Sequence, residues 1–154
     1  MKRLMLIAAL LLSGCMGQST TKSDYDRVYI GYTVAGGPTP KERHTTEHVI
    51  NNTAISYTTR YSNGTVSYRK TGEITLYEYR QIGKNVAETG VYGMLDRYTP
   101  AAAQTGDTSS ATLLVSIDGR NKTVEMKPYV EEYLPGNIQK IISEVKHVTQ
   151  SLQP

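Results

Sequence analysis

"TLYEYRQIGKNVAETG", residues 75–90, is the stretch in which the apolar spacing changes from that of strands to that of a helix. Apolar side chains recur at helical intervals, at Leu76, Tyr79, Ile82 and Val86. Thr75 and Glu78 stand at the spacing of a capping box, and Gly90 is a typical residue for ending a helix. We therefore predict a helix over 76–89 with one buried face.

Strand signals lie on both sides of this helix. Residues that favour strands are concentrated in 27–34, 54–61, 65–70, 111–117 and 121–127. The dipeptides Asn63-Gly64 and Asp118-Gly119 are typical of tight hairpins, whose central residues need positive φ. Residues 44–61 indicate one long strand or two short ones interrupted near Asn51. These segments predict consecutive antiparallel hairpins.

A second helix is predicted over 136–149, because Ile138, Ile141, Ile142, Val145 and Val148 fall on one side. Two helices with one apolar face each need a surface to cover. We therefore expect an α+β fold in two layers, with an antiparallel sheet of about five strands and both helices packed on one of its faces. The side chains expected to be buried are Ile30, Leu76, Tyr79, Ile82, Val86, Val115, Ile117, Ile138, Ile141 and Val145.

The N-terminus has the layout of an export signal. A basic start, Met1-Lys2-Arg3, precedes a run of nine apolar residues over 4–12, and Ser13-Gly14-Cys15 follows. Nine residues reach about 14 Å as a helix, too short to span a membrane core of about 30 Å. We predict a signal peptide over 1–14, a flexible tether over 15–24 and a single α+β domain over 25–150.

The stretch Leu12-Ser13-Gly14-Cys15 resembles the lipobox of prokaryotic lipoproteins, and "LLLSGCMG" resembles archaeal signals in particular. The resemblance implies that Cys15 is lipidated and becomes the first mature residue. Cys15 is the only cysteine of the chain, so no intramolecular disulfide is available to it. Two acyl chains make such an attachment durable. We expect a lipid-anchored protein on the extracytoplasmic face of the cell membrane.

Charge and aromatic content narrow the choice of partners. Loss of Lys2 and Arg3 with the signal lowers the 17 basic side chains to 15, against 14 acidic ones, which leaves a mature net charge of +1. No basic stripe indicates nucleic acid. The chain has 12 tyrosines and neither phenylalanine nor tryptophan. The tyrosines can serve as core aromatics whose hydroxyls reach the rim, or they can form a recognition face.

The stretch "HTTEH" (44–48) has the H-x-x-E-H spacing of one class of zinc peptidase. Its β-branched threonines favour a strand, in which His44 and His48 lie about 13 Å apart and Glu47 faces the other way. We therefore expect no catalytic residue, no metal and no cofactor. A zinc hydrolase is the alternative if this stretch is helical.

Three sites match the glycan acceptor pattern: Asn51, Asn63 and Asn121. They are candidate glycosylation sites. Asn63 is also explained by the turn in which it stands.

The order of elements over 25–150 resembles small exported domains of archaea and bacteria, and more loosely the emfourin-type inhibitors of thermolysin-like peptidases. The segments that carry the resemblance are "YIGYTVAGG", "SNGTVSY", "TGEITLYEYRQI", "GVYGMLDRY", "LLVSIDGRNKTVEM" and "YLPGNIQKIISEV". It implies a non-catalytic binding module, with a peptidase inhibitor as the alternative. The inhibitor reading gives the loops at 35–42 and 99–110 as contact segments and a peptidase as protein partner.

Changing Cys15 to Ser removes the thiol that accepts the lipid. We expect the variant to leave the membrane fraction or to accumulate as an uncleaved precursor. Membrane fractionation and the apparent mass of the mature chain measure this. A variant that matures and fractionates like the parent would show that the lipoprotein interpretation is wrong.

Overall fold

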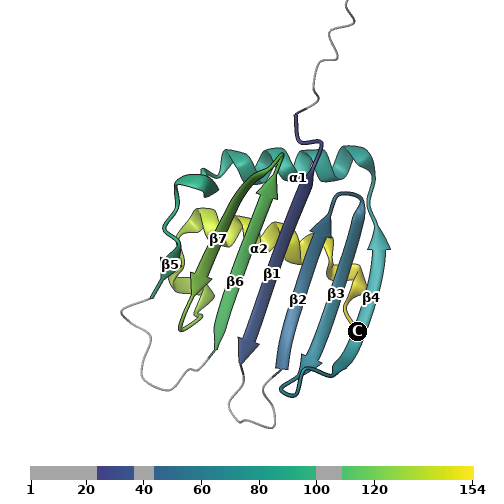
Figure 1. Ribbon diagram of the computed structural model, residues 1–154, viewed down its shortest axis with the longest axis vertical. Helices are drawn as coiled ribbons and strands as arrows, with labels where there is room; N and C mark the ends of the chain where they lie inside the picture. Colours follow the sequence, from purple (N-terminus) through teal and green to yellow (C-terminus); the bar gives the residue numbers. More distant parts are fainter. Residues whose placement is uncertain (1–23, 37–43, 100–108) are drawn as a thin grey trace, which may run out of the picture.

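The computed structural model describes residues 24–36, 44–99 and 109–154. The predicted signal peptide and Cys15 lie outside these residues, as do most of the loops at 35–42 and 99–110. The fold is α+β, as predicted, and consists of an open seven-stranded sheet with two α-helices on one of its faces (Figure 1). No described helix is both long enough and apolar enough to cross a membrane.

The chain first forms a meander of four strands and then a helix. The elements are β1 (Val28–Gly36), β2 (His44–Asn51), β3 (Ala54–Tyr61), β4 (Val66–Glu73) and α1 (Leu76–Glu88). They are followed by β5 (Arg97–Tyr98), β6 (Ser110–Ile117), β7 (Arg120–Met126) and α2 (Gly136–Val148). Three short 3-10 turns complete the fold: η1 (Val91–Gly93), η2 (Glu131–Tyr133) and η3 (Gln150–Leu152).

The strand order is β4-β3-β2-β1-β6-β7-β5, and every neighbouring pair is antiparallel except β5 with β7. The expectation of about five strands is therefore low by two. Strand β2 is separate from β3, and β5 has only two residues, too few to show any periodicity. Strand β5 exists because the carbonyls of Asp96 and Tyr98 accept hydrogen bonds from the amides of Glu125 and Lys127 at 2.8 and 3.1 Å.

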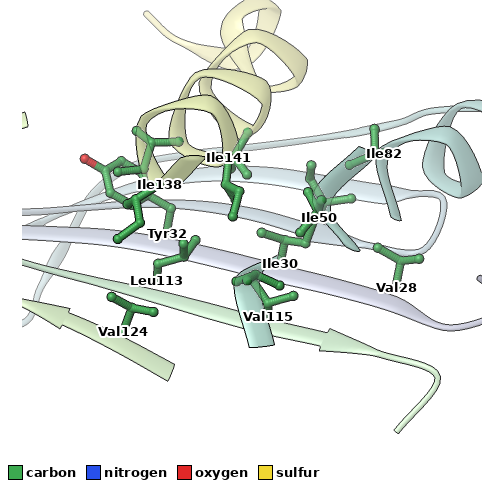
Figure 2. Packing of buried hydrophobic residues seen from close by; sticks show 14 of the residues in the cluster. Val28, Ile30, Tyr32, Ile50, Ile82, Leu113, Val115, Val124, Ile138 and Ile141 are labelled. Atoms are coloured by element: carbon green, nitrogen blue, oxygen red, sulfur yellow. The ribbon is translucent and has the colours of Figure 1, made fainter. Parts of the chain in front are cut away.

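Both helices cover the same face of the sheet, and both contact side chains on one side of β1. Val28 and Tyr32 point to that side, since they are an even number of residues apart. Val28 lies beneath Gly83 of α1, and the Tyr32 ring lies beneath Lys146 of α2, 5.6 Å from its ammonium nitrogen. Figure 2 shows α2 above this layer, with Ile138 and Ile141 directed at the sheet. The face therefore carries the core.

Nine of the ten side chains expected to be buried are buried, and Leu76 is the exception with 53% exposure. Leu76 is the first residue of α1, and α1 follows directly on β4, which is the edge strand of the sheet. The first turn of the helix has no further strand beneath it. The apolar stripe of α1 therefore becomes buried only from Tyr79 onward.

The capping box and the terminal glycine predicted for α1 are both confirmed. The Thr75 hydroxyl accepts a hydrogen bond from the amide of Glu78, and the Glu78 carboxylate accepts one from the amide of Thr75. Gly90 lies just beyond the helix with φ +76°, the left-handed conformation that favours glycine. Helix α1 is thereby fixed at both ends by local sequence.

The two predicted hairpins differ from each other. Asp118 and Gly119 both have positive φ, as a two-residue turn of this kind requires. In the β3–β4 hairpin only Gly64 has positive φ, and the Tyr61 amide and carbonyl bond across a longer loop to Thr65 and Gly64. The expectation of a tight Asn63-Gly64 turn is wrong in this detail. A register shift at Thr59 and Arg60 absorbs the extra residue.

Gly83 sets the distance between α1 and β1. A Cβ atom at this position would lie 2.6 Å from Cγ2 of Val28, a stiff and fully buried side chain. Alanine favours a helix over glycine by about 1 kcal/mol, but overpacking costs about 1–3 kcal/mol. We therefore expect Gly83→Ala to lower the free energy of unfolding by about 1 kcal/mol, measured by urea denaturation.

Gly93→Ala is the matched control, because nothing lies within 4 Å of an added Cβ at that position. We expect it to leave the unfolding midpoint nearly unchanged. A stabilised Gly83→Ala variant would contradict the close packing of α1 on β1.

Candidate functional site

The "HTTEH" stretch forms the start of β2, so its local conformation is the strand predicted for it. His44 is exposed, whereas His48 points into the core with 4% exposure. Residues four apart in a strand are about 13 Å apart, and Glu47 lies on the opposite face. The described residues hold no group of three or more His, Cys, Asp or Glu side chains placed to bind a metal. The geometry of β2 gives no support to the zinc hydrolase alternative.

His48 instead fastens the end of α2 to the sheet. Its Nδ1 lies 2.7 Å from the hydroxyl oxygen of Thr149, and that hydroxyl donates to the carbonyl of Val145 at 2.8 Å. The Thr149 proton is thus used, so His48 donates from Nδ1. Burial, and then the positive charge of Lys146, lowers the pKa of His48 to about 4. The ring is neutral near pH 7.

A second chain of polar groups, which is partly buried, runs beside His48. The Tyr32 hydroxyl donates to that of Tyr129 at 2.6 Å, and Tyr129 donates to the Glu131 carboxylate at 2.5 Å. Lys146 donates to the same carboxylate oxygen at 2.5 Å. Burial raises the pKa of both Tyr32 and Tyr129. Burial alone would raise the pKa of Glu131 too, but its hydrogen bonds from Lys146 and Tyr129 and the Lys146 charge together lower it.

This network joins the C-terminal part of the chain to β1. Its donors and acceptors satisfy one another, and the hollow of about 300 Å³ between α1 and α2 is lined by other residues, among them Asn85, Thr89 and Lys140. The Tyr32, His48 and Tyr57 rings lie in a row beneath α2, with centroids 5.7 and 5.0 Å apart, and the last pair meets edge to face. Most of the aromatic content thus serves the core, which was one of the two roles expected for the tyrosines.

The opposite face of the sheet is left uncovered by the described helices. Figure 1 looks onto this uncovered face, with both helices behind the strands. Its side chains are the alternate residues of each strand, in register across the sheet. Short hydroxyl side chains are the most numerous kind: Thr33, Thr45, Ser56, Thr71, Ser110, Thr112, Ser116 and Thr123, whereas Thr58 is buried.

The centre of the uncovered face is apolar and flat. Gly31 stands there, paired with Leu114 on β6 and Val49 on β2. The Tyr29 ring lies over the glycine, because a Cβ at Gly31 would be 3.2 Å from the Tyr29 hydroxyl oxygen and 3.3 Å from its ring carbon Cε1. Leu114 is 39% exposed. The side chains of Leu114, Tyr29 and Val49 therefore form a platform across β6, β1 and β2.

The charges on the uncovered face balance. The strand residues of this face include Arg60, Arg69, Arg97, Glu47, Glu73 and Glu125. Arg97 and Glu125 form an ion pair of 2.8 Å at the β5 end, and Arg69 donates to the Thr58 hydroxyl. Glu47 makes no ion pair within the described residues, and its charge, after burial, contributes to the raised pKa of Tyr29. The face is polar without being basic or acidic.

The candidate glycosylation sites fall in two places. Asn51 and Asn121 are exposed on the uncovered face, in the cross-strand row of Tyr29 and Ser116. Asn63 is exposed in the β3–β4 loop, where its side-chain oxygen accepts a hydrogen bond from the Thr65 amide at 2.9 Å. A glycan on Asn51 or Asn121 would stand over the uncovered face.

The stems of the two loops proposed as inhibitory contact segments come together. Ala35 and Ser110 are paired across β1 and β6, and a Cβ at Gly36 would lie 2.6 Å from the Ser109 Cα. The two loops therefore begin side by side at one end of the sheet. Their central residues, 37–43 and 100–108, lie outside the described residues.

Sequence patterns missed the central platform of the uncovered face. The available signal is a break in alternation: Leu113 and Leu114 are adjacent, so one of them must leave the core. A glycine inside a strand, Gly31, is a second signal, since it marks a close approach of another group. Neither identifies Tyr29 as that group. Neither a protein-family model nor a curated protein sequence matches this chain.

The low pKa of His48 predicts a loss of stability in acid. Between pH 6.5 and about 4 the unfolded chain binds a proton at this ring and the folded chain does not. The free energy of unfolding should therefore fall as pH is lowered through this window, by up to about 3 kcal/mol. Urea denaturation at pH 7, 6, 5 and 4.5 measures the slope.

His48→Gln keeps a donor for Thr149 but cannot bind the proton, so its slope over the same window should be flatter. His147→Gln replaces an exposed histidine of α2 and serves as the matched control. Equal slopes for His48→Gln and the parent would contradict the buried neutral histidine.

Proposed function

We propose that the protein is a lipid-anchored binding module on the extracytoplasmic face of the cell membrane and that it acts through the uncovered face of its sheet. The anchor follows from the lipobox-like stretch that ends at Cys15. The first described residue, Asp24, stands nine positions further on. A tether of small polar residues between them allows the domain to turn on its anchor.

The observation that carries this proposal is the bare sheet face itself. Six strands at spacings of about 4.8 Å, each about eight residues long, give a sheet surface of roughly 24 Å by 24 Å. That area is of the order of the 800 Å² or so that one partner contributes to a standard interface. Its apolar centre and polar surround also match the usual arrangement of such interfaces.

A binding role fits the described chemistry better than catalysis does. The titratable groups beside α2 are already engaged: His48 is buried and bonds to Thr149, and the half-buried Glu131 bonds to Lys146. The uncovered face offers hydroxyls and a ring platform. These groups recognise a partner through hydrogen bonds and contact, and nothing in their arrangement activates a nucleophile.

The second candidate is a peptidase inhibitor, and one observation favours it. The stems of the loops at 35–42 and 99–110 touch at Gly36 and Ser109, so the two loops can present one joint contact surface. Stoichiometric inhibition of a thermolysin-like peptidase by the purified chain would support this candidate over the sheet face. A binding module that acts through the uncovered face leaves such a peptidase fully active.

Leu114→Lys places a charge at the centre of the uncovered face. We expect it to weaken binding of the chain to isolated cell envelopes of its own organism by about tenfold or more, because central interface positions carry most of the binding energy. Tyr77→Lys is the matched control, since Tyr77 is 72% exposed on α1, on the other side of the sheet.

Co-sedimentation with the envelopes measures both variants. Equal retention of Leu114→Lys and the parent would count against the uncovered face as the binding surface.

A further inference from the structure

The Tyr29 ring on the uncovered face is placed as a stacking platform. A tyrosine ring that points straight out from a sheet does not cover the residue two positions later in the strand. Here the hydroxyl end of the Tyr29 ring lies over Gly31. Leu114 and Val49 flank the same glycine on the neighbouring strands. Aromatic faces carry negative charge density and attract polarised C–H groups.

Free hydrogen-bonding groups surround this platform. The Tyr29 hydroxyl and the Glu47 carboxylate make no hydrogen bond within the part of the chain that the structure describes. Thr33 and Thr112 lie side by side on β1 and β6, in the same row as Glu47. A ligand that lies on the ring can therefore bond to several donors and acceptors at its edges.

We infer that the uncovered face binds a neutral, extended β-linked glycan chain. Such a chain is a flat ribbon with C–H groups on its faces and hydroxyls along its edges, and both features have counterparts here. The balanced charges of the face fit a neutral ligand. Tyr29 lines none of the hollows between the helices, at the β7 edge or beside the Asp118-Gly119 turn, so the platform suits a chain that lies across it.

Other occupants fit this surface less well. Nucleic acid and anionic lipid require a net positive face, whereas the charged strand residues here are three arginines and three glutamates. A second copy packed face to face would bury eight hydroxyl side chains and these charges around a small apolar centre, which costs desolvation. The face is therefore better matched to a hydroxyl-rich ligand than to itself.

This inference rests on the proposed function, since it names the ligand class of the same face. The purified full chain is tested for retention on microcrystalline cellulose and on chitin, with starch granules as the α-linked comparison. The protein comes from a host that adds no N-glycans, because Asn51 and Asn121 open onto the face. We expect retention on cellulose or chitin and little on starch.

Two substitutions of one residue separate stacking from hydrogen bonding. Tyr29→Phe keeps the ring and should keep most of the retention, whereas Tyr29→Ala should lower it about tenfold. Tyr77→Ala removes an exposed tyrosine from α1 and should change nothing. Leu114→Lys, at an exposed position, provides a second loss-of-binding variant in case Tyr29→Ala is poorly folded.

The outcomes separate the ligand from the function. Absence of retention on both cellulose and chitin, equal retention on starch, or full retention of both Tyr29→Ala and Leu114→Lys would overturn the glycan assignment. Envelope binding that is lost in Leu114→Lys would then still support a binding module with a protein partner. A dimer in sedimentation that Leu114→Lys dissociates would assign the face to a second copy instead.

Discussion

The packing of one face of β1 beneath both helices is the constraint on which the structure depends. Gly83 brings α1 onto Val28, and Lys146 brings α2 over Tyr32. Val28 and Tyr32 are four residues apart in β1 and lie on the same side. Because β1 is the middle strand of the sheet, this choice fixes the side of the core for the strands on either hand. The other side of the sheet carries neither of the described helices and presents its threonines, its serines and the Tyr29 platform.

The polar groups beneath α2 include residue types that are common in catalytic sites, but here their hydrogen bonds connect distant parts of the chain. His48 belongs to a stretch with peptidase spacing, yet its ring is held by Thr149, 101 positions away in the sequence. Tyr32 is joined to Tyr129, 97 positions away. Both bonds attach the C-terminal part of the chain to the meander at its start. Their effect is to position α2, whose apolar side chains complete the core.

The sequence predicted the elements whose signals are local. Helix α1 has its capping box, its apolar stripe and Gly90 within 16 residues, and all three were found. Strand β5 could not be predicted, because two residues carry no pattern and their pairing depends on a distant strand. The prediction that Leu76 is buried was wrong, because apolar periodicity describes the helix and not where the sheet beneath it ends. The network arises from contacts between residues far apart in the chain, so no short pattern encodes it, whereas the uncovered face leaves only the weak signals of Gly31 and the adjacent Leu113 and Leu114.

The direction of β1 relates the expected anchor to the two candidate surfaces. β1 begins beside α1 and ends at Gly36, where the loop stems meet, about 27 Å further along the strand. An attachment through Cys15 would enter the domain at the start of β1, so the loop end of β1 would be the end farther from the anchor. The uncovered face runs along the side of the sheet, between these two ends. The two candidate functions therefore use different surfaces of the domain, and a substitution on one leaves the other intact.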